Sequence, residues 1–352
     1  MGALKGEPDQ NQTGLAANAT GGLQTTASSA VAPAIPKPRR GLVVSTAMVL
    51  VVLLVGESVY FASNSPYFFT WNNWLNILTA AAIAGIIAAP GTMLLIAGQF
   101  DLSVGSGVAF CGMILAVVSN SHGLTVGVLA AVLAGIGLGA LNGFLVTVIG
   151  VNALITTLGT LAVFRGLTEV VSGGQTQSVN GFSTLGSARP FLTIPLPVII
   201  FVAVVAIFWF ILRYTTYGRS MYAIGANAVA ARLVGIRSKL FIFIAFLLSG
   251  ACVALGGLIN ASQLGSGSPI TAQGLELSVI TAIVLGGTSL TGGRGTVLGT
   301  IVGLLVISAM NNGLVLINVD PFYQDVARGA LLILAVSFDR LSSRLSARLA
   351  GG

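Results

Sequence analysis

Charged residues are scarce in this sequence. Only 7% of its 352 residues are Asp, Glu, Lys or Arg, whereas a soluble domain carries about a quarter. Hydrophobic residues make up 55% of the chain, and 46 residues are glycine. This shortage of charge excludes an ordinary soluble protein. The long apolar runs instead predict an all-α polytopic membrane protein.

Cysteine and histidine are also rare. The two cysteines, Cys111 and Cys252, lie inside apolar runs and predict neither a disulfide framework nor a metal cluster. His122 is the only histidine and falls at a predicted outer turn, which leaves no Ser/His/Asp or Cys/His set for nucleophilic catalysis. We therefore expect no catalytic residues, no metal and no cofactor, and we do not expect an enzyme.

One glycine-rich stretch invites comparison with a phosphate-binding loop. GGTSLTGGRG, at residues 286–295, lacks the Gly-Lys-Ser/Thr ending of such a loop and follows a membrane run rather than a strand. The chain is therefore not expected to hydrolyse a nucleotide itself.

A helix that crosses a bilayer needs about 20 apolar residues, and the chain offers about ten such segments within a transmembrane domain at 41–339. They lie near 42–62, 73–96, 102–120, 123–147, 153–171, 194–213, 240–261, 275–290, 296–317 and 323–338. A broken or re-entrant segment is the alternative for two of them, because 73–96 contains Pro90 and 275–290 ends in glycines.

The two ends of the chain differ from this domain. Residues 1–40 are rich in small polar residues and predict a disordered cytoplasmic tail. Residues 340–352 predict a short basic cytoplasmic tail. A cleaved signal peptide is the alternative for the first apolar run, but some forty residues precede that run and no clear cleavage site follows it.

The net charge of +7 reflects orientation rather than nucleic-acid binding. An inside N-terminus places all cations except Arg165, Arg189 and Arg328 in inner loops and tails, as the positive-inside bias requires. These cations do not form one basic face, so we expect membrane lipid and no nucleic acid as a partner. Both termini are predicted to be cytoplasmic.

Residues 213–239 form a polar, basic island between two apolar runs. The island contains no acid and five cations: Arg213, Arg219, Arg232, Arg237 and Lys239. Within it, Asn227 to Val234 predicts one short helix, which Asn227 caps at its start and Gly235 ends in a left-handed conformation. Such a helix would give a cytoplasmic partner something to grip.

The same island carries a resemblance to a known family. Its sequence YGRSMYAIGANAVAARLVGI begins at Tyr217 and resembles the cytoplasmic loop of ribose-type monosaccharide ABC importer permeases. Three further stretches match in order: GQFDLSVGSG from Gly98, NALITTLGTLAVFRGL from Asn152, and ELSVITAIVLGGTSLTGGRGTVLGT from Glu276. The family usually has a second Gly and often a Glu in the loop, where this chain has Ala226 and Val229.

The resemblance implies a permease subunit in a bacterial inner membrane, with an ABC ATPase subunit powering it. A coupling helix would dock on the ATPase, with coupling residues Gly225, Asn227, Ala231, Arg232, Leu233 and Gly235. An extracytoplasmic sugar-binding protein would deliver the sugar to the outer loops, chiefly Ser172 to Thr193 and Ser262 to Gly274. A second permease subunit, expected to be another copy, would complete the path.

Several alternatives stay open from the sequence. A permease of the branched-chain amino acid type has a similar membrane plan, and an ion-coupled secondary transporter would need no coupling helix. The sugar is also open, with ribose, xylose, arabinose, a related hexose and a polyol all compatible with the resemblance. A paralogue is the alternative to a second copy of the chain.

Polar residues inside apolar spans are the candidates for the translocation path, because such residues usually face the bundle interior or water. They are Asn142, Asn152, Thr156, Thr157, Arg165, Glu276, Asn311 and Asn312. Hydrogen bonds between helices explain the uncharged ones equally well. We expect Arg165 to pair with Glu169, and Asp325 with Arg328, as structural ion pairs. Asp101 is expected to cap a helix.

Glycine spacing makes two further predictions. Gly135, Gly139 and Gly143 recur every four residues, as do Gly295, Gly299 and Gly303, so each set predicts a smooth helix face for close packing. Separately, Gly98, Leu102, Gly105 and Gly107 share their spacing with Gly286, Leu290, Gly293 and Gly295. That echo suggests an internal parallel repeat, with chance as the alternative.

Overall fold

The computed structural model describes residues 46–191 and 193–320, and beyond them only 322–324, 326–327, 329–331, 333–334 and 337. The predicted tails at 1–40 and 340–352 lie outside the described residues, as do Asp325 and Arg328.

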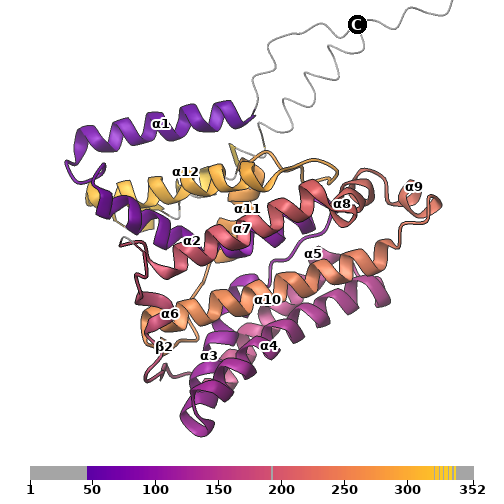
Figure 1. Cartoon of the computed structure of the whole chain (residues 1–352), viewed down its shortest axis with the longest axis horizontal. Coiled ribbons are helices and arrows are strands. Elements are labelled where there is room, and N and C mark those ends of the chain that lie inside the picture. Colours follow the sequence, from indigo (N-terminus) through magenta and orange to yellow (C-terminus); the bar gives the residue numbers. More distant parts are fainter. Residues whose placement is uncertain are drawn as a thin grey trace, which may run out of the picture. The chain divides into compact units, whose positions relative to one another are not determined.

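Helices dominate the described residues (Figure 1). They are α1 (Thr46–Asn64), α2 (Trp71–Ile96), α3 (Val104–His122), α4 (Leu124–Phe144) with a π-helical continuation (Leu145–Ile149), α5 (Ala153–Ser172), α6 (Thr184–Ser187), α7 (Leu196–Tyr214), α8 (Thr216–Ala226), α9 (Ala228–Leu233), α10 (Ser238–Leu264), α11 (Leu275–Leu285) and α12 (Val297–Leu316). Two short strands, β1 (Gln177–Ser178) and β2 (Ser266–Gly267), pair antiparallel.

The prediction of an all-α polytopic protein is confirmed. Seven described helices are long and apolar enough to cross a membrane, and two shorter apolar helices lie at Met48–Asn64 and Leu275–Leu285. α2 is unbroken at Pro90, whereas α11 ends at Leu285 rather than at 290. Gly287 there adopts φ +85°, a conformation that glycine tolerates without steric cost. Most of the predicted segment 323–338 lies outside the described residues.

α10 lies at the centre of the packing. It contacts α4, α3 and α2, and α2 in turn contacts α7, α11 and α12, while α1 packs on α12 (Figure 1). The largest cluster of buried side chains draws on α2, α3, α7, α10, α11 and α12, with Ile86, Met93 and Phe246 fully buried. The bundle therefore has a continuous apolar core.

The predicted smooth glycine face is confirmed for Gly135, Gly139 and Gly143 of α4, and for Gly299 and Gly303 of α12, whereas Gly295 precedes α12 and lies in the loop before it. A Cβ on Gly139 would overlap the carbonyl oxygen of Phe246, and one on Gly135 would lie 2.6 Å from the Gly250 carbonyl oxygen, both on α10. Gly303 faces Ala282 of α11 in the same way. Without side chains at these contacts, the backbones of α4 and α10 approach closely, as do those of α11 and α12.

Gly139→Val is expected to destabilise the protein by about 1–3 kcal/mol, because the added side chain would overlap the backbone of α10. Gly137→Val in the same helix is the matched control, since a Cβ there meets nothing within 4 Å. Thermal unfolding in detergent would compare the two variants. Equal melting temperatures would contradict the close approach of α4 and α10.

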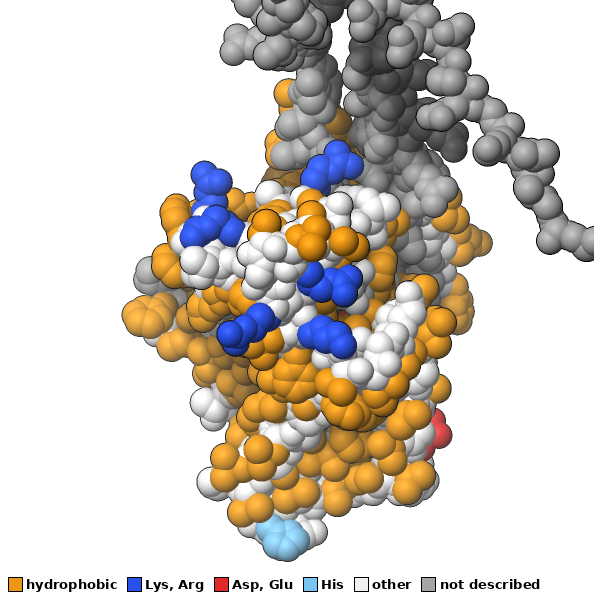
Figure 2. Space-filling model, turned by 90° about the vertical axis from the view of Figure 1, so that its right-hand side faces the viewer, with side chains coloured by type: hydrophobic (Ala, Val, Ile, Leu, Met, Phe, Trp, Pro, Cys, Tyr) orange, Lys and Arg blue, Asp and Glu red, His pale blue; other side chains and the backbone are white. Residues whose placement is uncertain are grey.

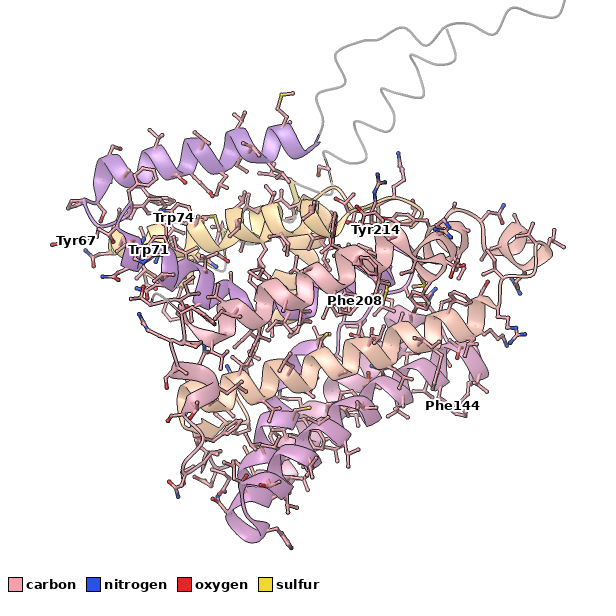
Figure 3. The ribbon with its side chains drawn as sticks, viewed as in Figure 1. Tyr67, Trp71, Trp74, Phe144, Phe208 and Tyr214 are labelled. Carbon is pink, nitrogen blue, oxygen red and sulfur yellow. The ribbon has the colours of Figure 1, made fainter. Side chains whose placement is uncertain are left out.

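Aromatic side chains mark the two ends of the bundle. Tyr67 and Trp71 are exposed near the N-terminus of α2, whereas Tyr214 is exposed at the C-terminus of α7, toward the other end (Figure 3). Trp and Tyr concentrate at the two membrane–water interfaces. We call the end that holds α8, α9 and the loops 97–103 and 286–296 the basic end, and the end that holds α6, β1 and β2 the opposite end.

Candidate functional site

The basic island folds into two short helices. In α9, the predicted short helix, Asn227 Oδ1 accepts hydrogen bonds from the N–H groups of Val229 and Ala230, both at 3.0 Å. Gly235 follows with φ +86°. The predicted helix with its cap and glycine stop is confirmed.

α8 is a helix that the sequence analysis missed. Thr215 caps it by accepting a hydrogen bond from the N–H of Gly218 at 3.1 Å. Tyr217, Met221 and Ile224 pack against the core from its inner face. Their spacing of four and three residues, after a capping threonine, was the available signal.

α9 presents apolar side chains at the surface. Leu233 is 84% exposed and Val234 is 77% exposed, and Val229 is exposed beside them. Ala231, by contrast, is buried against the core. The predicted coupling residues therefore fall into three groups by their position in the structure. Leu233 and Arg232 lie at the surface, Asn227 and Gly235 shape the helix ends, and Gly225 and Ala231 face inward.

Lys and Arg side chains gather around α8 and α9 (Figure 2). Those of the island, namely Arg213, Arg219, Arg232, Arg237 and Lys239, are all exposed. The exposed apolar residues of α9 are thus surrounded by positively charged side chains. An acidic or apolar partner surface would fit this end of the bundle.

The end of α8 is seated on two loops that are distant in sequence. A Cβ on Gly225 would overlap the carbonyl oxygen of Ile96 and lie 2.6 Å from the amide nitrogen of Gly293. These two groups bond to each other, with Gly293 N–H donating to Ile96 O at 2.8 Å. The contact joins the α2–α3 loop, the α11–α12 loop and the basic island.

Tyr222 adds a second link between α8 and the α11–α12 loop. Its hydroxyl donates to the carbonyl oxygen of Gly295 at 2.8 Å. Burial raises the pKa of Tyr222, although nearby Arg213 partly opposes this shift. The phenol therefore stays protonated at neutral pH and keeps its proton for this bond.

A cavity of about 460 Å³ opens at the basic end beside α9. Its polar lining includes Gln99, Asn152, Arg232 and Lys239. Asn152 also caps α5, accepting from the N–H of Leu154 at 2.9 Å. Of the predicted path residues, Asn152 thus lies at the basic end of the bundle.

The prediction that Asp101 caps a helix is wrong. Its Oδ1 accepts from the N–H and hydroxyl of Ser103, which precedes the first residue of α3 and makes no side-chain cap itself. Its Oδ2 accepts from Ser249 of α10 at 2.9 Å. Ser103 in turn accepts from Asn142 of α4 at 2.8 Å. Asp101 is therefore held both by Ser103, just before α3, and by Ser249 of α10.

The predicted Arg165–Glu169 ion pair is also wrong. Among the described residues, Arg165 bonds instead to two backbone carbonyls, with Nη1 donating to Pro269 at 2.6 Å and to Thr271 at 2.9 Å. The guanidinium extends away from α5 because these carbonyls lie in a loop packed against that helix. Arg165 thereby anchors the loop between β2 and α11.

The two predicted outer loops form one connected surface at the opposite end. β1 and β2 join them, with Gln177 paired to Gly267. Ser262 accepts from the N–H of Gly186 at 2.8 Å and donates to the carbonyl of Phe182. The loops therefore share hydrogen bonds rather than projecting separately.

The remaining path candidates lie apart from one another. Thr157 bonds within its own helix to Ala153 O. Among the path candidates, four polar atoms are buried without a hydrogen-bond partner: Asn142 Oδ1, Thr156 Oγ1, Glu276 Oε2 and Asn311 Oδ1. Asn311 and Asn312 line a second cavity, between α2, α11 and α12.

Two asparagines near this second cavity, Asn73 and Asn76, were not among the residues predicted from the sequence. Asn73 and Asn312 bond reciprocally through their amides at 2.8 and 3.0 Å, and Asn76 lines the cavity. Amides three residues apart at the start of α2 share one helix face. That spacing was the signal in the sequence.

The shared glycine spacing of residues 98–107 and 286–295 suggested an internal repeat, and the contacts of these two stretches do not decide whether it exists. Both echo stretches lie at the basic end and touch through the Gly293–Ile96 bond. Gly98 has φ +74°, whereas its counterpart Gly286 has φ −65°. The internal repeat stays a prediction.

Comparison with known proteins places the chain in a family. Residues 73–336 match the family described as "Branched-chain amino acid transport system / permease component". The L-arabinose transport system permease protein AraH of Escherichia coli (strain K12) is 40% identical over 303 residues, which cover 84% of this chain and 90% of that protein.

Two further relatives come from the same organism. The D-allose transport system permease protein AlsC is 37% identical, over 81% of this chain and 88% of its own length. The ribose import permease protein RbsC is 37% identical, over 82% and 92%. No solved structure matches the chain. These relatives are transport permeases rather than enzymes, as the sequence predicted.

Proposed function

Because the chain belongs to this family of multi-pass transport permeases, we propose that it is the membrane subunit of an ABC importer for a monosaccharide. The relatives named for arabinose, allose and ribose support a sugar over a branched-chain amino acid. An ion-coupled secondary transporter is disfavoured by the same relationship. A pentose or an aldohexose is the expected cargo.

One observation carries the coupling part of this proposal. α9 is a capped, six-residue helix whose apolar side chains are exposed, and the end of α8 just before it is seated on the α2–α3 and α11–α12 loops. A separate ATPase subunit would hold Leu233 and its neighbours in an apolar groove. Movement of α9 would then reach the α2–α3 and α11–α12 loops directly through Gly225.

The basic end is proposed to be cytoplasmic in the bacterial inner membrane. The exposed cations around α8 and α9 support this orientation, because short loops rich in Lys and Arg stay on the cytoplasmic side. The opposite end would then receive an extracytoplasmic sugar-binding protein on the surface formed by the loops around β1, β2 and α6. Two copies of the chain would form the complete path.

Reconstitution would test the function. The chain would be placed in proteoliposomes with the ATPase and binding protein encoded beside it, and offered labelled L-arabinose, D-ribose and D-allose. We expect uptake that requires ATP and the binding protein. Uptake that proceeds without the ATPase, or that follows an imposed ion gradient, would overturn the proposal.

Arg165→Met is expected to weaken binding-protein docking. The variant loses two charge-assisted hydrogen bonds to the 268–272 loop, each worth about 1.5–3 kcal/mol, so that loop should loosen. We expect faster hydrogen exchange there and at least fivefold weaker affinity for the sugar-loaded binding protein. Exposed Arg219→Met is the charge-matched control. Unchanged exchange in the loop would show that Arg165 does not anchor it.

A further inference from the structure

The second cavity is lined by apolar and uncharged polar side chains. It measures about 410 Å³, within the range of about 300–1,000 Å³ typical of small-molecule sites. Six of its lining residues carry amides or hydroxyls, and none of them is charged: Asn76, Ser278, Ser308, Asn311, Asn312 and Gln324. They come from α2, α11, α12 and the chain just beyond α12.

Only part of this polar set is used by the fold. Asn312 is occupied by its reciprocal bonds to Asn73, and Ser278 donates to the Gly274 carbonyl at 3.0 Å. Asn311 Oδ1 is buried without a partner. Within the described residues, no hydrogen bond holds the side chain of Asn76 or of Ser308.

A buried amide oxygen without a partner, such as Asn311 Oδ1, is costly inside a transmembrane bundle, so it is retained where a ligand or water completes its hydrogen bonds. The Asn76 side chain is exposed and can also reach such a ligand. Donors and acceptors without any charge match a neutral ligand that carries several hydroxyl groups. An amino acid zwitterion would leave its two charges unpaired here. The chemistry of the lining thus selects a sugar over the amino acids for which the family is described.

The cavity also lies at a suitable depth. Asn76 is near the start of α2, and Ser308 and Asn311 are in the last half of α12, so the site is in the half of the bundle nearer the opposite end. On the proposed orientation, a sugar leaving the binding protein would meet this cavity first. α11, which forms one wall, is linked through its following loop to the seat of α8.

We propose that this cavity between α2, α11 and α12 is a sugar-binding station on the import path, with Asn76, Ser308 and Asn311 as its free polar contacts. The proposal rests on the proposed function of the chain as a sugar permease. It assigns the site to residues of a single protomer.

Thiol accessibility tests the site directly. The native Cys111 and Cys252 are buried, so background labelling is low. Ser308→Cys would be labelled with a charged methanethiosulfonate reagent in the purified permease–ATPase complex, without ATP or binding protein. Met310→Cys, on the same helix but outside the cavity lining, is the control. The reaction is run in a high concentration of L-arabinose, and separately in glycine betaine at the same concentration.

We expect Ser308→Cys to react, and its rate to fall at least threefold in L-arabinose but not in betaine, with Met310→Cys insensitive to both. A Ser308→Cys that resists the charged reagent would show a cavity facing lipid or closed by a second copy of the chain, and would overturn the proposal. Equal rates in sugar and betaine would overturn it as well.

Uptake by Asn76→Leu and Asn311→Leu gives an independent readout. Both variants should cut the rate of ATP-driven uptake at least tenfold while membrane levels and ATPase binding stay normal. Normal uptake by both variants would overturn the sugar station and leave the permease function standing. Failure of the wild-type complex to take up any sugar would instead overturn the proposed function.

Discussion

Leu233→Asp is expected to abolish ATP-driven uptake, with a loss of at least tenfold. Leu233 is the most exposed large apolar side chain of the described residues, at 84%, and it lies on a helix that makes few contacts with the rest of the bundle. A carboxylate in an apolar groove of the ATPase would lose its hydration without a partner. A cost of about 1.4 kcal/mol already corresponds to tenfold weaker docking.

Copurification of the ATPase with the permease separates docking from folding. We expect Leu233→Asp to reach the membrane at the wild-type level and to lose the ATPase. Ile270→Asp is the matched control, because Ile270 is 72% exposed in the loop between β2 and α11, at the opposite end. It should retain the ATPase. If Leu233→Asp still copurified with the ATPase and transported sugar, α9 would not be the coupling helix.

Gly225→Val is expected to reduce uptake at least tenfold by a different route. The valine side chain would overlap the Ile96 carbonyl and crowd the Gly293 amide, so α8 must lift from its seat or the Gly293–Ile96 bond must break. Overpacking of this kind costs about 1–3 kcal/mol. α9 itself is unchanged, so the ATPase should still bind while its motion no longer reaches the two loops.

The diagnostic result for Gly225→Val is retained ATPase binding, and retained ATP hydrolysis, with lost uptake. Gly159→Val in α5 is the control, since a Cβ at that glycine meets nothing within 4 Å. Wild-type uptake by Gly225→Val would show that the seat of α8 does not transmit motion. A variant that fails to insert would be replaced by Gly225→Ala, whose single added carbon still overlaps the Ile96 carbonyl.

The sequence alone determined the local features of the protein, namely the ranges of its helices and the ends of α9. Apolar length predicts spanning helices because an unsatisfied backbone is excluded from lipid, and most predicted ranges agree with helices within a few residues. α9 was equally predictable, because an asparagine cap and a glycine stop act on their own neighbours in the chain. The matching family stretches added the transport class.

Contacts between distant segments could be decided only by the tertiary structure. Asp101 resembled a cap, yet it bonds to Ser249, 148 residues away. Arg165 had an acid one turn on, yet it donates to the carbonyls of a loop about a hundred residues later. The seat of Gly225 and the cavity of Asn76, Ser308 and Asn311 likewise join separate helices. Periodicity places a polar residue on a helix face, but only packing determines which group that face meets.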